Sequence, residues 1–205
     1  MNRYDARKQA LADFVRHLAS LAHRAREGDR AARASARASL ARLRRGLDRP
    51  PGSAPETLEE VLPYLRAEAR EDEYAREREL YFLIGSLFAR HPGHSQEHRN
   101  LGNLGATMRA LGTDNPSAVQ RFTSLLAARR DQLPDLLRQA VSLAAGDEVP
   151  VNYYQLAQDL LDWDADDRRV QLAWAREYWP PQARPEPAPA SGTTAPVATQ
   201  EGNHA

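Results

Sequence analysis

The amino-acid sequence predicts an all-α protein made of two small packed helical bundles and a disordered C-terminal tail. Apolar residues recur at three- and four-residue steps through nearly every segment up to residue 179, a spacing that places them on one face of a helix. No segment shows the alternation or the turn dipeptides of a β-hairpin. We expect an N-terminal bundle over residues 1–112, a C-terminal bundle over 113–179 and the tail over 180–205.

Four helices are expected before residue 91. Apolar spacing predicts the first over 10–25, and Asp29 is the expected N-cap of a second that continues to about Leu47. A short acidic helix, bent or broken by Pro63, follows over 56–70. The next helix, over 72–90, contains LYFLIGSLF, which is apolar all round. We therefore expect this helix to be buried at the centre of the fold.

Capping residues mark the helix starts in the second half of the chain. Asn103, Asn115 and Asn152 are expected N-caps, and Asp166 is the expected N-cap of the last helix. The helices expected here are 103–111, one that begins after Asn115, 132–145, 152–162 and 166–178. In the tail, Val197 is the single large apolar residue, so the tail cannot bury enough surface to order itself.

Composition excludes several classes of site. The chain has no cysteine, which rules out disulfides, cysteine-ligated zinc and iron–sulfur clusters. It contains no nucleophile-elbow motif, P-loop or dinucleotide-binding fingerprint. It has no long apolar run and no N-terminal export signal. We therefore expect a soluble, cytoplasmic protein that is not an enzyme, needs no cofactor or metal and does not contact a membrane.

Charge is unevenly distributed along the chain, although the formal net charge is zero. Residues 1–50 carry 13 basic and 5 acidic residues, a net charge of +8. Residues 51–80 carry 4 basic and 9 acidic residues, a net charge of −5. This segregation predicts a basic face that attracts a polyanion.

The expected second helix concentrates this positive charge. On a helical wheel one stripe contains four arginines: Arg30, Arg33, Arg37 and Arg44. Arg42 and Arg45 lie on another flank. No acidic residue lies between Asp29 and Asp48 to pair with these arginines along the helix. The stripe predicts contacts with successive phosphates. The alternative is an ordinary surface helix that pairs with the acidic segment over 56–79.

The segment HPGHSQEHRNLGNLG, residues 91–105, contains the spacing of a zinc site. His94, Glu97 and His98 match the H-x-x-E-H motif of inverted metallopeptidases, so a metallohydrolase is one alternative for this chain. The motif follows Pro-Gly, and no large apolar residue lies between 93 and 100 to anchor a helix. We therefore expect a polar loop without a metal.

The same segment leads into a helix start. Gly102, Asn103 and Gly105 lie at the point where free N–H groups and the helix dipole favour an anion. Arg99 precedes this point and Arg109 follows it. We therefore add Arg99 and Arg109 to the candidate phosphate contacts. The alternative is a glycine turn with a purely structural role.

Five aromatic residues of the C-terminal half lie at helical spacings: Tyr153, Trp163, Trp174, Tyr178 and Trp179. Packing into the core is their expected role. Stacking on nucleic-acid bases is the alternative.

Several segments, taken in order, resemble the small subunit of the type I-E CRISPR effector complex Cascade, the CasB family. The most specific are NLGATMRALG, RFTSLLAARRDQLPDLLRQAVSLAA and VNYYQLAQDLLDWDADDRRVQLAWAREYW. The basic segment DRAARASARASLARLRRGL is similar to the second helix of the same family. The resemblance covers roughly residues 5–179, and the Pro-rich tail lies outside it.

The resemblance implies a non-catalytic, all-α protein that sits as a pair of copies on the inner side of a guide-RNA–protein filament. Such proteins help to hold the target DNA and the guide RNA, and they guide the displaced single-stranded DNA over a basic surface. The large, backbone and RNA-processing subunits of Cascade and a second copy of the chain are the implied protein partners. The backbone contacts it favours are Arg44, Arg45, Arg109, Arg121, Arg130 and Arg138. The alternative is a helical protein–protein interaction module without nucleic-acid contact.

Overall fold

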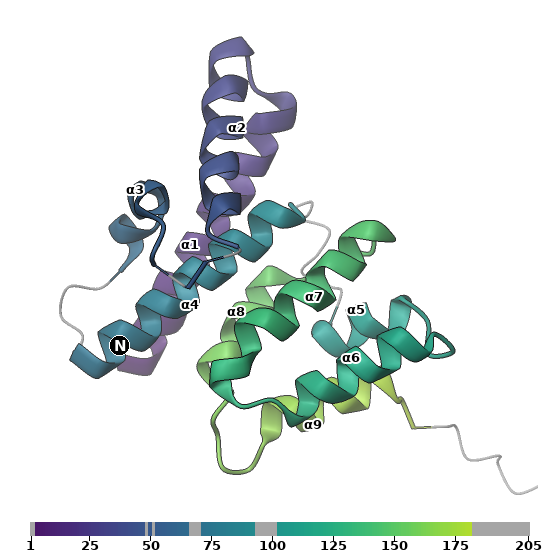
Figure 1. The fold of residues 1–205 in the computed structure, drawn as a ribbon. Helices are drawn as coiled ribbons and strands as arrows, with labels where there is room; N and C mark the ends of the chain where they lie inside the picture. Colours follow the sequence, from purple (N-terminus) through teal and green to yellow (C-terminus); the bar gives the residue numbers. More distant parts are fainter. Residues whose placement is uncertain (1–2, 48, 51, 66–70, 93–101, 182–205) are drawn as a thin grey trace, which may run out of the picture.

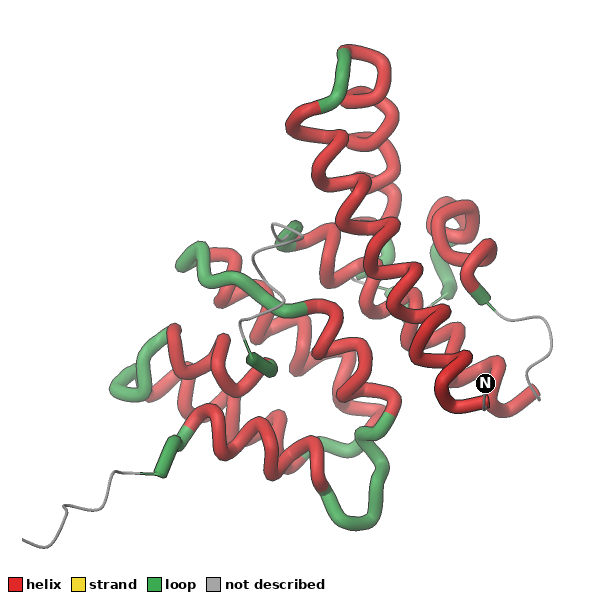
Figure 2. The backbone as a smooth tube through the Cα atoms, turned by 180° about the vertical axis from the view of Figure 1, so that it is seen from behind, coloured by secondary structure: helices red, strands yellow, loops and turns green. Residues whose placement is uncertain are grey.

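The computed structural model describes residues 3–47, 49–50, 52–65, 71–92 and 102–181. Within these ranges the protein contains nine α-helices, three short 3-10 helices and no strand. The all-α prediction is therefore confirmed (Figure 1). The view from behind shows the same helices joined by loops (Figure 2). The predicted tail lies almost entirely outside the described residues.

α1 (Arg3–Glu27) and α2 (Arg30–Arg45) form a long hairpin that projects from the rest of the protein (Figure 1). Asp29 fixes the turn between them, because its side chain accepts a 2.8 Å hydrogen bond from the N–H of Ala32. This is the cap that the sequence predicts. The apolar sides of α1 and α2 pack along each other, and the outer side of α2 faces solvent.

The segment after α2 is interrupted at Pro63, as the sequence predicts, but it is divided into more pieces than one helix with a single break. It contains three short elements, η1 (Pro55–Thr57), α3 (Leu58–Val61) and η2 (Leu62–Tyr64). Pro63 interrupts the helical hydrogen bonding because proline has no N–H to donate. The described part of the segment ends at Leu65, so the remainder of the prediction lies outside the described residues.

Six elements form the C-terminal half: α5 (Leu104–Ala110), α6 (Pro116–Ala127), η4 (Arg130–Gln132), α7 (Leu133–Gly146), α8 (Tyr153–Leu161) and α9 (Arg169–Tyr178). The predicted caps at Asn103, Asn115 and Asn152 are confirmed, since each side chain accepts a hydrogen bond from the first turn of its helix. The predicted cap at Asp166 is wrong. Arg168 has a left-handed backbone with φ of 51°, so α9 begins only after it.

α4 (Glu71–Arg90) is the central helix of the fold, as its apolar sequence predicts. It packs on α1 and α2 and also on α7 and α8, and residues 80–88 are buried or half-buried. A Cβ at Gly85 would lie 3.2 Å from side-chain atoms of Leu43 and Phe14. The missing side chain therefore lets α1 and α2 approach α4 closely.

The two halves share one continuous hydrophobic core. Hydrogen bonds also join them. Nη1 of Arg138 donates to the main-chain oxygen of Leu47 at 2.9 Å. The hydroxyl of Tyr153 donates to the main-chain oxygen of Leu87 at 3.0 Å. α5 packs mainly on α9. The division of the chain at residue 112 stays a prediction. None of the described helices combines the length and apolarity that crossing a membrane requires.

Candidate nucleic-acid interface

The arginine stripe of α2 lies on the solvent side of the projecting hairpin. The opposite side of the helix buries Ala36, Leu40 and Leu43 against the core. The four stripe arginines, Arg30, Arg33, Arg37 and Arg44, and the neighbouring Arg45 are exposed and form no ion pair with any residue that the structure describes. The packing of the apolar side therefore fixes the direction in which this positive charge points.

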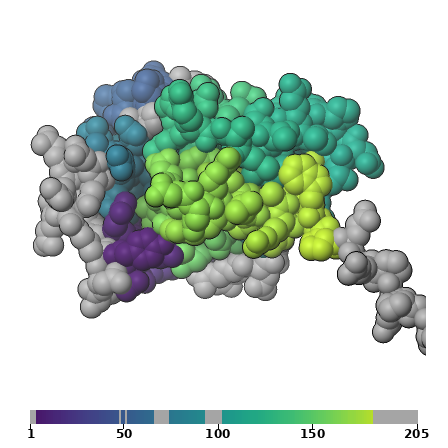
Figure 3. Space-filling model, turned by 90° about the horizontal axis from the view of Figure 1, so that it is seen from below, coloured from purple at the N-terminus to yellow at the C-terminus, as the bar shows by residue number. Residues whose placement is uncertain are grey.

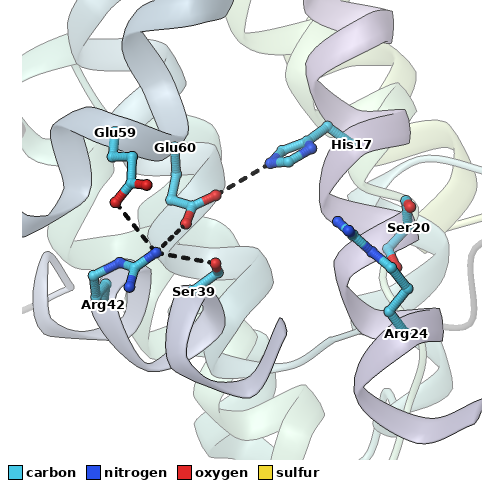
Figure 4. A network of polar contacts seen from close by, with 7 residues as sticks. All are labelled: His17, Ser20, Arg24, Ser39, Arg42, Glu59 and Glu60. Carbon is cyan, nitrogen blue, oxygen red and sulfur yellow. Dashed lines mark hydrogen bonds and ion pairs between the residues drawn. The ribbon is translucent and has the colours of Figure 1, made fainter. Parts of the chain in front are cut away.

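The acidic segment pairs with a different flank of α2. Arg42 lies 2.7 Å from the carboxylate of Glu60 and 3.4 Å from that of Glu59 (Figure 4). Beyond α2, Arg49 lies 3.8 Å from Glu56. These glutamates therefore pair with Arg42 and Arg49, and within the described residues no acidic side chain forms an ion pair with a stripe arginine.

Glu60 links three helices of the N-terminal half. Its buried carboxylate faces Arg42 of α2 and lies 3.2 Å from Nε2 of His17 of α1 (Figure 4). Burial alone would raise the pKa of Glu60, but hydrogen bonds from Ser39, Arg42 and His17 together hold this pKa below its ordinary value. Among the described acidic residues, Glu59 and Glu60 thus stabilise the hairpin and do not cover its outer side.

Arg44 and Arg138 lie at the joint between the two halves. Nε of Arg44 donates to the main-chain oxygen of Ala89 near the end of α4 at 3.0 Å. Arg138 donates to Leu47 and forms an ion pair with Asp135. A guanidinium has five N–H donors, so Arg44 keeps donors for a ligand.

Arg130 is turned toward a cavity between the two halves. It forms an ion pair with Asp164, and its Nη2 donates to the main-chain oxygen of Leu160 at 3.0 Å. The cavity has a volume of about 280 Å³, and its charged lining residues are Arg7, Arg76, Arg130, Asp162, Asp164 and Arg169. Acidic groups therefore lie among the basic ones around Arg130, unlike the surroundings of the α2 stripe.

Arg109 and Arg121 lie at the far end of the protein, on α5 and α6. Arg109 is exposed, and its Nη1 lies 3.5 Å from the main-chain oxygen of Glu177. Arg121 is half-buried and donates to the hydroxyl of Ser117. The fold does not bring these two arginines onto the α2 stripe, because α5 packs mainly on α9 while α2 packs on α1 and α4. Arg99 lies outside the described residues.

The glycine in the first turn of α5 has a packing role. A Cβ at Gly105 would overlap the main-chain oxygen of Trp174 and lie 2.8 Å from its carbonyl carbon. The N–H of Gly105 donates to the side chain of Asn103 at 2.8 Å. Close contact with α9 thus explains why residue 105 is a glycine. The Asn103 cap also occupies the N–H of Gly105, which a bound anion would need as a donor. The alternative of a glycine turn with a purely structural role therefore accounts for this helix start.

The H-x-x-E-H residues His94, Glu97 and His98 lie outside the described residues. The neighbouring His91 is described, and its Nε2 lies 2.8 Å from the main-chain oxygen of Val149. No group of three or more His, Asp or Glu side chains that could hold a metal occurs in the described part of the chain.

The aromatic residues divide into two groups. Tyr153, Trp163, Trp174 and Tyr178 are buried, as expected for core residues. Trp179 is 48% exposed. Arg176, which was not among the predicted contacts, is exposed as well. Its position three residues before Trp179 places the two side chains on neighbouring parts of one surface.

Comparison with known proteins identifies the family. The family model for "CRISPR-associated protein Cse2" matches residues 39–179. The Cse2 protein of Thermus thermophilus is 39% identical over 142 residues, which cover 69% of this chain and 79% of that protein.

Solved structures show the same fold. A Cse2-family protein from Thermus thermophilus gives a TM-score of 0.65 at 31% identity, covering 87% of this chain and 99% of that one. A chain of a structure described as a CRISPR RNA-guided surveillance complex gives a TM-score of 0.58 at 22% identity, with 81% and 93% of the two chains covered. The family match spans both helical halves, and the chain therefore belongs to the Cse2 family of CRISPR-associated proteins.

Proposed function

We propose that the chain is a non-catalytic small subunit of a type I-E CRISPR RNA-guided surveillance complex. In this role it holds guide RNA and target DNA and guides the displaced DNA strand over a basic surface. Membership of the Cse2 family supports the assignment, as does the fold shared with a chain of a CRISPR RNA-guided surveillance complex. The observation that carries it is the exposed arginine stripe of α2, which has no acidic partner among the described residues.

The mechanism is electrostatic. Arg30 and Arg37 lie seven residues apart, which is about 10 Å along a helix, and Arg33 lies between them. Arginines at this spacing neutralise successive phosphates and release counterions, whatever the base sequence. Base pairing with the guide RNA reads the target, and the protein contributes contacts that tip a nearly balanced exchange of strands.

The other candidate arginines contribute to different degrees. Arg45 and Arg109 are exposed, and Arg44 and Arg121 keep unused donors, so these four extend the contact surface beyond α2. Arg130 and Arg138 already face carboxylates, so a phosphate must compete with an acid there. Arg99 stays a proposed contact, although it lies outside the described residues.

The proposed partners are the guide RNA, the target DNA, the displaced strand, the larger Cascade subunits and a second copy of the chain. The competing function is a helical module that binds acidic protein surfaces only. Binding of the purified chain to single-stranded DNA of random sequence at low salt separates the two. We expect salt-dependent binding that Arg37→Gln weakens. Arg16→Gln is the matched control, because Arg16 is an exposed hairpin arginine already paired with Asp13. No binding by the unaltered chain would leave the interaction module as the function.

A further inference from the structure

The outward side of α9 combines apolar and basic side chains. Leu172 is 52% exposed and Trp179 is 48% exposed, although both belong to residue types that are usually buried. Arg176 is exposed and lies four residues after Leu172 and three before Trp179, so the three residues follow one stripe. Figure 3 shows the α9 region (yellow-green) running across this face of the molecule toward the C-terminal end.

The indole of Trp179 is held in place by two other rings. Its centroid lies 4.6 Å from that of Tyr178 in an edge-on contact and 5.6 Å from that of Phe122. The main-chain N–H of Trp179 donates to the main-chain oxygen of Ala175 at 2.8 Å, which fixes the backbone at the end of α9. A ring that is already ordered loses little conformational entropy when a ligand stacks on it.

Three arginines lie on the elements next to this ring. Arg109 lies beside the main-chain oxygen of Glu177, and Arg121 directly precedes Phe122, whose ring contacts the indole. Arg176 lies on the same stripe. None of these three arginines forms an ion pair with a residue that the structure describes. The one acidic residue of α9 is Glu177, which is also exposed.

We propose that Trp179 stacks on an unpaired base of single-stranded nucleic acid, while Arg109, Arg121 and Arg176 contact the phosphates on either side of that base. An exposed, pre-ordered aromatic ring among unpaired arginines has the composition of a single-strand binding platform. Tryptophan and arginine are also enriched at protein–protein interfaces, so the comparison of normal and abasic strands is what separates base stacking from a protein-docking face. The inference rests on the proposed function, since single-stranded nucleic acid must reach this chain.

The intrinsic fluorescence of the chain provides a direct test. Trp163 and Trp174 are at most 2% exposed, and their indole N–H groups donate to Ala128 and Asp159. Stacking on a base therefore quenches mainly Trp179. We expect a single-stranded oligothymidylate to quench the fluorescence of the full chain, and an abasic strand of equal length to quench it far less. Equal quenching by the two strands would overturn the proposal.

Affinity measurements on variants complete the test. Trp179→Ala is expected to weaken oligothymidylate binding about 5- to 150-fold, and Trp179→Phe is expected to restore most of the affinity because it keeps a ring. Leu172→Ala is the matched control from the same stripe, and equal melting temperatures verify folding. For the abasic strand, Trp179→Ala and the unaltered chain should bind alike. Unchanged binding by Trp179→Ala with weakened binding by Arg37→Gln would refute the stacking role and leave the proposed function standing. No binding by the unaltered chain would refute both.

Discussion

The guanidinium of Arg42 lies 2.7 Å from the buried carboxylate of Glu60, so one arginine of α2 is committed to the fold while those of the stripe face solvent. Arg42 and Arg37 are both arginines of the same helix, only five residues apart. They nevertheless have different environments. Replacing Arg42 should therefore lower the stability of the fold, and replacing Arg37 should weaken binding to nucleic acid.

Replacing Arg42 is expected to lower stability without removing a stripe contact. Arg42→Ala leaves the carboxylate of Glu60 buried with one partner fewer, which costs about 1–3 kcal/mol. Arg37→Ala removes an exposed side chain and should change the free energy of unfolding by less than about 0.5 kcal/mol. Chemical denaturation of both variants measures the difference. Equal losses of stability would show that the contact between Arg42 and Glu60 does not hold the hairpin.

The pKa of Glu60 predicts how stability depends on pH. Because this pKa is lower in the folded protein than in the unfolded chain, the ionised carboxylate stabilises the fold. This contribution is fully present above the unfolded value of about 4.5 and is lost as pH falls through the lower folded value. Glu60→Gln removes it.

We therefore expect the difference in free energy of unfolding between the unaltered chain and Glu60→Gln to be largest near neutral pH and to shrink below about pH 4.5. Denaturation curves collected across the acidic range measure it. A difference that stays constant down to about pH 3 would contradict the assigned role of the carboxylate.

Two glycines make a matched pair for testing the packing of α5 on α9. At Gly105 a Cβ would overlap the backbone of Trp174, so Gly105→Ala must push the two helices apart and should cost about 1–3 kcal/mol. At Gly146 nothing lies within 4 Å of the added Cβ. Gly146→Ala should therefore be neutral or stabilising by up to about 1 kcal/mol. Thermal melting of both variants measures these changes in stability. If Gly105→Ala were as stable as the unaltered chain, the close packing of α5 on α9 would be contradicted.

Local sequence features were sufficient to predict much of the fold. Asp29 and Asn152 were identified as caps because a cap depends on residues only a few positions away. The same reasoning failed at Asp166, because the left-handed backbone of Arg168 lies between this residue and α9. Nothing in the local sequence marks that conformation at an arginine.

Long-range contacts decided the parts of the candidate site that the sequence did not reveal. Arg42 lies on a different flank of α2 from Arg37, but only the fold shows that α3 places Glu60 beside it, 18 residues farther along the chain. Trp174 and Trp179 are both tryptophans near the C-terminus of the fold, yet one is buried and the other is half-exposed. The Trp174 side chain packs against Trp163 and donates to Asp159, and helix spacing alone does not specify these contacts.

The salt dependence of R-loop formation tests the central claim most directly. The unaltered chain and a triple variant, Arg30→Gln with Arg33→Gln and Arg37→Gln, are each assembled with their partner subunits and guide RNA. Target binding is then measured between about 50 and 200 mM salt, with Arg16→Gln as the control. We predict that the triple variant binds more weakly at low salt, with a slope of log affinity against log salt shallower by about two to three units. A triple variant that keeps the affinity and slope of the unaltered complex would contradict a phosphate-binding role for the α2 stripe.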